Sequence, residues 1–223
     1  MIPLRDENPT RTFAFVTVGI IALNVVVFWH ELSLPEGARA EAFFGSFALI
    51  PAHLTRMRSP EAYRSIFTSM FLHGGWLHLI GNMWFLWLFG NNIEDSVGHF
   101  KFVIFYLLCG VAAATAQVAI SPDSTVPMIG ASGAISGVLG AYLVLFPRAR
   151  VLTLVPIWIF LQFIHVPAVI FLILWFAIQF LSGLATSQLT VNGGVAFWAH
   201  VGGFVAGLVL ILPFKKRGVR LFQ

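Results

Sequence analysis

The residue that first indicates chemistry in this sequence is a serine that stands among glycines. The stretch GASGAISG places Ser132 between Gly130 and Gly133, and these glycines permit a tight backbone conformation around the hydroxyl. A serine hydroxyl is a weak nucleophile unless a neighbouring group accepts its proton, and histidine has a suitable pKa. His200, in the apolar stretch AHVGGFVAGL, is the candidate base. Together the two residues predict nucleophilic attack on a carbonyl group.

A second pair of polar residues, His78 and Asn82, is suited to stabilise the charge that such an attack creates. They are four positions apart, so on a helix they lie about 40° apart on one face. An imidazole N–H and an amide N–H are both hydrogen-bond donors, and such donors form an oxyanion hole. The free backbone N–H groups of a helix that begins near Ser132 are further donors of this kind.

The composition indicates which elements must position these residues. Of 223 residues, 58% are hydrophobic and only 10% are charged, and the mean hydropathy is +0.88, whereas soluble domains carry roughly 25% charged residues. We therefore expect an all-α membrane protein, built from spanning helices of about 20 mostly apolar residues each. Six ranges qualify, the fourth of them unusually short: Thr12–Trp29, Leu72–Gly90, Phe100–Ile120, Ser132–Phe146, Val166–Ala185 and Val195–Phe214.

The lysines and arginines indicate how this six-helix bundle is oriented. With the N-terminus inside, nine of them fall on inner segments and four on one long outer loop, so the positive-inside rule places both termini in the cytoplasm. We expect a single membrane domain over 1–223 in a multi-pass protein of the cell (plasma or inner) membrane. It would have a cytoplasmic N-terminal segment at 1–11, an outer interfacial loop at 31–70 and a cytoplasmic tail at 215–223. The net charge of +4 implies no nucleic-acid partner, because the basic residues gather at membrane boundaries.

Three of the polar residues are expected at one depth in the membrane. Ser132, His78 and His200 each precede the next charged residue by 15 or 16 positions, which places all three about 22–24 Å above the inner boundary. A fourth helix that starts at this depth leaves its first N–H groups without partners, which is tolerated only where they meet protein or water. Taken singly, the serine also fits a helix cap, the glycines fit helix packing, and the His–Asn pair fits a hydrogen bond between helices. The shared depth favours one site.

Small residues predict that the fourth and sixth helices pack closely. Gly203 and Gly207 are four positions apart, as are Gly133 and Gly137, and this spacing lets membrane helices approach each other. Contact between these faces would bring the serine and the histidine within hydrogen-bond reach. The predicted spans contain no acidic residue placed to orient His200, so we expect a dyad rather than a triad. No HExxH motif occurs, and the chemistry needs neither a metal nor an organic cofactor.

Three stretches of the chain resemble the rhomboid family of intramembrane serine proteases: FLHGGWLHLIGNMWFLWLFGNNIED, GASGAISGVLGAY and AHVGGFVAGL. The resemblance implies that Ser132 is the nucleophile and His200 the base. It also implies an oxyanion hole lined by His78, Asn82 and the backbone N–H of Ser132. Some members carry a tyrosine four residues after the nucleophile, packed against the base. Here that position is Ser136, so the ring of His200 would be supported from elsewhere.

The function expected from these observations is that of an intramembrane serine endopeptidase. The resemblance implies substrates with a single spanning helix, which enter between the second and fifth helices and are cut near the outer membrane face. Hydrolysis at that depth requires water, so we expect a cavity open to the outer side. The partners are then single-pass membrane proteins and the lipid bilayer, and the sequence leaves the oligomeric state open. Two alternatives remain: a non-catalytic rhomboid-like protein that binds membrane helices, and a transporter with a broken helix at its substrate site.

Overall fold

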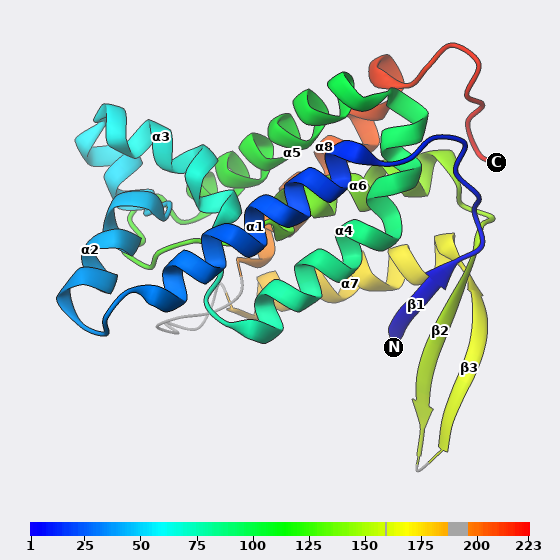
Figure 1. Ribbon diagram of the computed structural model, residues 1–223, viewed down its shortest axis with the longest axis horizontal. Coiled ribbons are helices and arrows are strands. Elements are labelled where there is room, and N and C mark those ends of the chain that lie inside the picture. Colours follow the sequence, from blue (N-terminus) through cyan, green and yellow to red (C-terminus); the bar gives the residue numbers. More distant parts are fainter. Residues whose placement is uncertain (159, 187–195) are drawn as a thin grey trace.

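The computed structural model describes residues 1–158, 160–186 and 196–223, which form a bundle of helices with a small β-sheet at one end (Figure 1). Each of the six apolar ranges contains a helix: α1 (Phe15–Ser33), α4 (Trp76–Val97), α5 (His99–Ile120), α6 (Ser132–Leu145), α7 (Ala168–Thr186) and α8 (Phe197–Phe214). α4 differs most from its predicted range, because it begins four residues later and continues through polar residues to Val97. Val195, the predicted start of the last range, lies outside the described residues.

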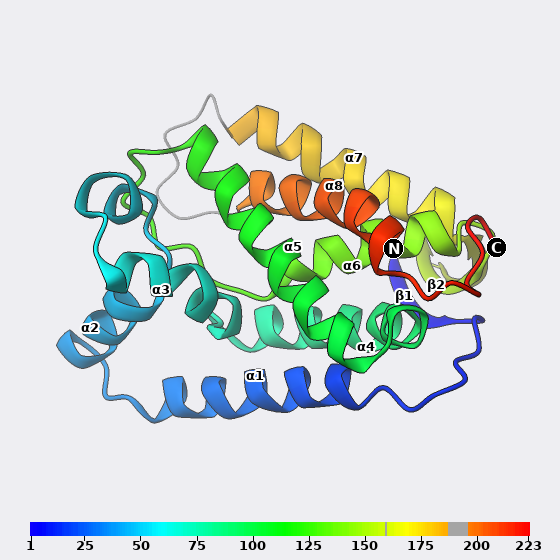
Figure 2. The ribbon, with the colours of Figure 1, turned by 90° about the horizontal axis from the view of Figure 1, so that it is seen from above.

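α6 lies in the middle of the bundle, with α4, α5 and α8 around it (Figure 2). It has 14 residues, which corresponds to a length of about 21 Å. Almost all of them are buried. In the described part of the chain, four other helices are long and apolar enough to cross a membrane, namely α1, α5, α7 and α8. The protein is therefore an integral membrane protein in which the helix that begins at Ser132 is enclosed by its neighbours.

The segment between α1 and α4 packs against the loop that leads into α6. It contains four short elements: α2 (Ala38–Phe47), η1 (His53–Met57), α3 (Pro60–Thr68) and η2 (Ser69–Phe71). The fully buried Leu49 exchanges two backbone hydrogen bonds with Met128, at 2.7 and 3.1 Å, and the N–H of Gly130 donates to the carbonyl of Ser69 at 2.9 Å. The segment predicted as an outer loop thus holds the backbone that precedes Ser132.

The prediction of an all-α fold is wrong at the opposite end of the bundle. There the chain forms an antiparallel sheet of three strands in the order β1 (Ile2–Asp6), β2 (Arg150–Ile157) and β3 (Phe160–Pro167). Residues 150–167 are rich in β-branched and aromatic residues, which favour strands, and a short apolar run does not by itself distinguish a strand from a helix. The strand pairing extends to Pro167, so α7 begins at Ala168 rather than at Val166. Trp84 of α4 donates to the carbonyl of Pro3 at 2.6 Å and ties the sheet to the bundle.

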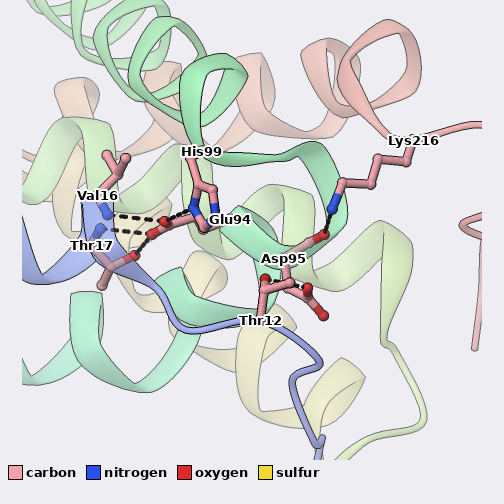
Figure 3. A network of polar contacts seen from close by, with 7 residues as sticks. All are labelled: Thr12, Val16, Thr17, Glu94, Asp95, His99 and Lys216. Carbon is pink, nitrogen blue, oxygen red and sulfur yellow. Dashed lines mark hydrogen bonds and ion pairs between the residues drawn. The ribbon is translucent and has the colours of Figure 1, made fainter.

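A buried carboxylate joins the helices at the same end (Figure 3). Glu94 of α4, which is fully buried, accepts hydrogen bonds from the backbone N–H groups of Val16 and Thr17 at 2.9 and 2.7 Å. These N–H groups belong to the first turn of α1 and have no partner within that helix, so the carboxylate caps it. Oε1 of Glu94, the oxygen that accepts from Val16, also lies 2.6 Å from Nδ1 of His99 at the start of α5. Lys216, just after α8, donates to the carbonyl of the neighbouring Asp95 at 2.7 Å. This network fixes the relative positions of four helices.

Candidate active site

Ser132 and His200 are in direct contact. Oγ of Ser132 lies 2.7 Å from Nε2 of His200, which is a normal distance for a hydrogen bond. Ser132 is the first residue of α6, and His200 lies in the first turn of α8 with only 8% of its surface exposed. When the hydroxyl donates to Nε2, the imidazole is placed to accept the proton as the oxygen attacks a carbonyl.

Close packing of α6 on α8 produces this contact. A Cβ on Gly203 would lie 3.0 Å from the carbonyl carbon of Gly133, and a Cβ on Gly207 would lie 2.6 Å from that of Gly137. Both distances are shorter than an ordinary van der Waals contact, so neither glycine leaves room for a side chain. The two helices therefore meet backbone to backbone, as the spacing of their small residues predicts. α5 contacts the same face, because a Cβ on Gly133 would lie 2.7 Å from the Cβ of Ala113.

His78 lies beside the backbone that precedes Ser132. Gly130 has a φ of +119°, a conformation that residues with a side chain rarely adopt. A Cβ at this position would also lie 2.6 Å from Nε2 of His78, so glycine is needed both for conformation and for space. The N–H of Gly74 donates to Nδ1 of His78 over 3.4 Å. A neutral His78 ring therefore carries its proton on Nε2, the nitrogen that faces Gly130.

Asn82 lies one helical turn after His78 and is 7% exposed. Its side-chain nitrogen donates to the carbonyl of His78 at 3.0 Å, and an amide nitrogen carries a second N–H that this bond does not use. Both side chains border the same cavity as Ser132 and His200. The backbone N–H of Ser132 belongs to the first turn of α6, where N–H groups have no partner within the helix. These three donors belong to residues that border the same cavity.

This cavity has a volume of about 720 Å³ and is bordered by residues of α4, α5, α6, α7 and α8. In the described part of the chain, none of its lining residues is Asp, Glu, Lys or Arg. The polar side chains among them belong to Ser69, His78, Asn82, Ser132, Gln179 and His200. The volume is in the range of small-molecule sites. A largely apolar cavity strengthens the hydrogen bonds of the few donors that it contains.

The ring of His200 is supported by residues that the sequence analysis did not identify. Oε1 of Gln179 lies 2.7 Å from Nδ1 of His200, and the ring of Trp175 lies 6.0 Å from the imidazole at an angle of 36°. Both residues come from α7. Ser136, at the position where some rhomboids carry tyrosine, instead donates to the carbonyl of Ser132 at 2.6 Å. A signal for Gln179 was present, because a polar residue within an apolar run usually faces the interior of the bundle.

The arrangement has the parts that acyl transfer requires: a nucleophile bonded to a base, and donors beside the nucleophile. Among residues 1–158, 160–186 and 196–223, no group of three His, Cys, Asp or Glu side chains is placed to hold a metal ion. The chemistry that the hydrogen-bonded serine–histidine pair supports is nucleophilic attack by Ser132.

Fold and site together define a helical membrane protein with a serine–histidine pair at an internal cavity. Residues 59–217, more than half of the chain, match the family model described as the Rhomboid domain. The chain belongs to the rhomboid family. It is 32% identical to the rhomboid protease GluP of Bacillus subtilis over 217 residues, which are 96% of this chain and 38% of that protein.

Other relatives differ in what their names say about activity. Rhomboid-like protein 11, chloroplastic, of Arabidopsis thaliana is 29% identical over 160 residues, which are 70% of this chain and 54% of that protein. Inactive rhomboid protein 1 of Drosophila melanogaster is 24% identical over 161 residues, which are 71% of this chain and 10% of that protein. The chain thus spans about half or less of the length of these relatives, and the family contains both a named protease and a named inactive member.

Proposed function

We propose that this protein is an intramembrane serine endopeptidase. The observation that carries the proposal is the 2.7 Å hydrogen bond between Oγ of Ser132 and Nε2 of His200. Oγ attacks the carbonyl carbon of a substrate peptide bond while its proton passes to Nε2. His200 then gives this proton to the leaving amine nitrogen as the C–N bond breaks. A water molecule attacks the acyl-enzyme, with His200 again accepting and returning a proton, and Ser132 is released.

The negative charge on the tetrahedral oxygen is stabilised by neutral donors in this mechanism. Nε2–H of His78, the second N–H of Asn82 and the backbone N–H of Ser132 form the oxyanion hole. The hydrogen bonds that His78 and Asn82 make within α4 and its preceding loop support this role, because they orient both side chains before a substrate binds. Such preorganised donors are worth about 10²–10³ each in kcat.

The proposal includes a placement in the membrane. α1, α4, α5, α6, α7 and α8 are the six spanning elements of one domain over 1–223, and α6 is recessed below the outer surface. Both termini are cytoplasmic in the cell (plasma or inner) membrane, and 31–70 lies at the outer face. The short length of α6 and its enclosed position support the recessed start. Water then reaches Ser132 from the outer side through the cavity.

The proposed substrates are membrane proteins with a single spanning helix, cut near its outer end. A peptide in a regular helix hides its carbonyl groups, so segments that contain glycine or proline should be cut most readily. They would enter between the second and fifth spanning helices, α4 and α7. Both helices border the cavity, which supports this route.

Labelling of the purified protein with a fluorophosphonate tests the proposal. We expect the wild type to be labelled on Ser132, and we expect no labelling of Ser132→Ala and at least a 10³-fold slower reaction of His200→Ala, since a serine without its base is a poor nucleophile. Labelling that persists in Ser132→Ala would show that another residue reacts. A wild type that is folded but unreactive would instead favour a non-catalytic protein that binds membrane helices.

A further inference from the structure

We propose that Gln179 is a positioning residue for His200: its side-chain oxygen accepts the hydrogen bond of Nδ1–H and so leaves Nε2 free to receive the proton of Ser132. The inference rests on the proposed function and adds a third residue to the pair that performs it. It also assigns a part of the reaction to α7, a helix that contributes neither the nucleophile nor the base.

The contact between Gln179 and His200 determines which ring nitrogen carries the proton. Oε1 of Gln179 is only an acceptor, and it lies 2.7 Å from Nδ1, so a neutral imidazole places its one proton on Nδ1. Nε2 then has a free lone pair and lies 2.7 Å from Oγ of Ser132. This is the tautomer that a base for the serine requires. With the proton on Nε2 instead, the ring could not accept from the hydroxyl.

Gln179 does for the ring what an aspartate does in a Ser-His-Asp triad, but without a charge. A triad aspartate holds the tautomer and also stabilises the imidazolium that forms. A neutral amide supplies the orientation and a dipole, and it avoids the cost of a carboxylate in a largely apolar cavity. The absence of Asp and Glu from the described lining of the cavity fits this solution.

Aromatic packing between α7 and α8 holds Gln179 opposite the imidazole of His200. Trp175 lies four residues before Gln179, and Phe204 lies four residues after His200, so on each helix the two residues share a face. The rings of Trp175 and Phe204 are stacked, with centroids 6.1 Å apart at an angle of 30°, and Phe204 is 3% exposed. The stacked rings fix the distance between α7 and α8 one turn away from the amide–imidazole contact.

A second glutamine near the site has a different contact. Oε1 of Gln117, on α5, accepts from the backbone N–H of Ala199 at 3.2 Å. Gln117 therefore stabilises the start of α8 through its backbone, whereas Gln179 contacts the imidazole itself. Only the contact between Gln179 and the imidazole can select a tautomer.

The test measures the rate of reaction with a fluorophosphonate in three variants. Gln179→Leu removes the acceptor at similar size, Gln179→Glu keeps an acceptor oxygen whether or not it is ionised, and Gln162→Leu on the exposed face of β3 is the matched control. For Gln179→Leu we expect the maximal rate of inactivation to fall about 10- to 100-fold, with the half-saturating concentration changed less than about twofold. Gln179→Glu should recover to within about fivefold of the wild type, and the control should react like the wild type.

Each other outcome overturns the inference. A Gln179→Leu variant that reacts at the wild-type rate shows that the amide does not position the base, and it leaves the role of Ser132 intact. Gln179 has only a structural role if Gln179→Leu lowers the melting temperature and the fraction of protein that can be labelled, while the labelled fraction still reacts at the wild-type rate. A Gln179→Glu variant as slow as Gln179→Leu shows that the acceptor oxygen is not what matters. Failure of the wild type itself to react counts against the proposed function.

Discussion

Adding one methyl group at Gly203 is expected to separate Ser132 from His200. The new carbon would lie 3.0 Å from the carbonyl carbon of Gly133, and closer still to its oxygen, where an ordinary contact needs at least 3.4 Å. Because the obstacle is backbone, α8 must move away from α6 by about 1 Å. The distance between Ser132 and His200 would then grow from 2.7 Å to about 3.7 Å, which is too long for a hydrogen bond.

Misplacement of this size costs about 100-fold in rate, and overpacking costs about 1–3 kcal/mol in stability. We therefore expect Gly203→Ala to stay folded in detergent, to melt at a lower temperature, and to react with a fluorophosphonate about 100-fold more slowly than the wild type. Gly19→Ala on α1 is the matched control. A Cβ at Gly19 would meet no atom within 4 Å, so this variant should react normally and gain about 0.5–1 kcal/mol in stability.

Two results for the glycine variants would contradict this prediction. If Gly203→Ala is labelled at the wild-type rate, the backbone contact between α6 and α8 does not set the geometry of the pair. If both glycine variants lose reactivity equally, the loss reflects a general sensitivity of the bundle to added methyl groups.

Three further perturbations test other parts of the structure. Glu94→Gln places an amide donor against backbone donors, so the free energy of unfolding should fall by about 2–4 kcal/mol in thermal unfolding experiments; a loss no larger than that of Asp95→Asn would count against the capping role. Burial raises the pKa of Asp6 from 3.8 to about 6, so the folded protein keeps a proton that the unfolded chain has released. Stability should therefore fall as the pH rises from about 4 to 6 and then level off, and an unchanged slope in Asp6→Asn would refute this assignment. Asn82→Ala should lower kcat about 100-fold with little change in KM, and an effect on KM alone would contradict an oxyanion-hole role.

The helical part of the fold was largely predictable, because apolar runs of membrane length are a strong signal in a single sequence. The start of α6 at Ser132 was also predicted, and the spacing of glycines correctly indicated which helices meet. The sheet was not predicted, because residues 150–167 are as apolar as a membrane-spanning helix. No local sequence pattern indicates that Ile2–Asp6 pairs with them. Strand pairing between distant segments is a property of the fold rather than of either segment.

The site was predictable to a different extent for each residue. Ser132, His200, His78 and Asn82 were named from their types, spacing and family motifs, and the structure places them around one cavity. Their chemical roles remain predictions. Gln179 was not predicted, because an acidic residue is the usual partner of a catalytic histidine and the spanning segments offered none. A glutamine makes the same hydrogen bond at no cost in buried charge, so amides within spanning segments are equal candidates for that position.

α7 contacts the rest of the bundle along one side, and many of its large apolar side chains are exposed to the surroundings. A helix held in this way takes its tilt partly from the hydrocarbon around it. Because Gln179 lies on α7, a change in this tilt would alter the proposed contact between its amide and the imidazole of His200, so we expect the reactivity of Ser132 to depend on bilayer thickness. The rate of fluorophosphonate labelling in vesicles of short-chain and long-chain phosphatidylcholine should accordingly differ more for the wild type than for Gln179→Leu.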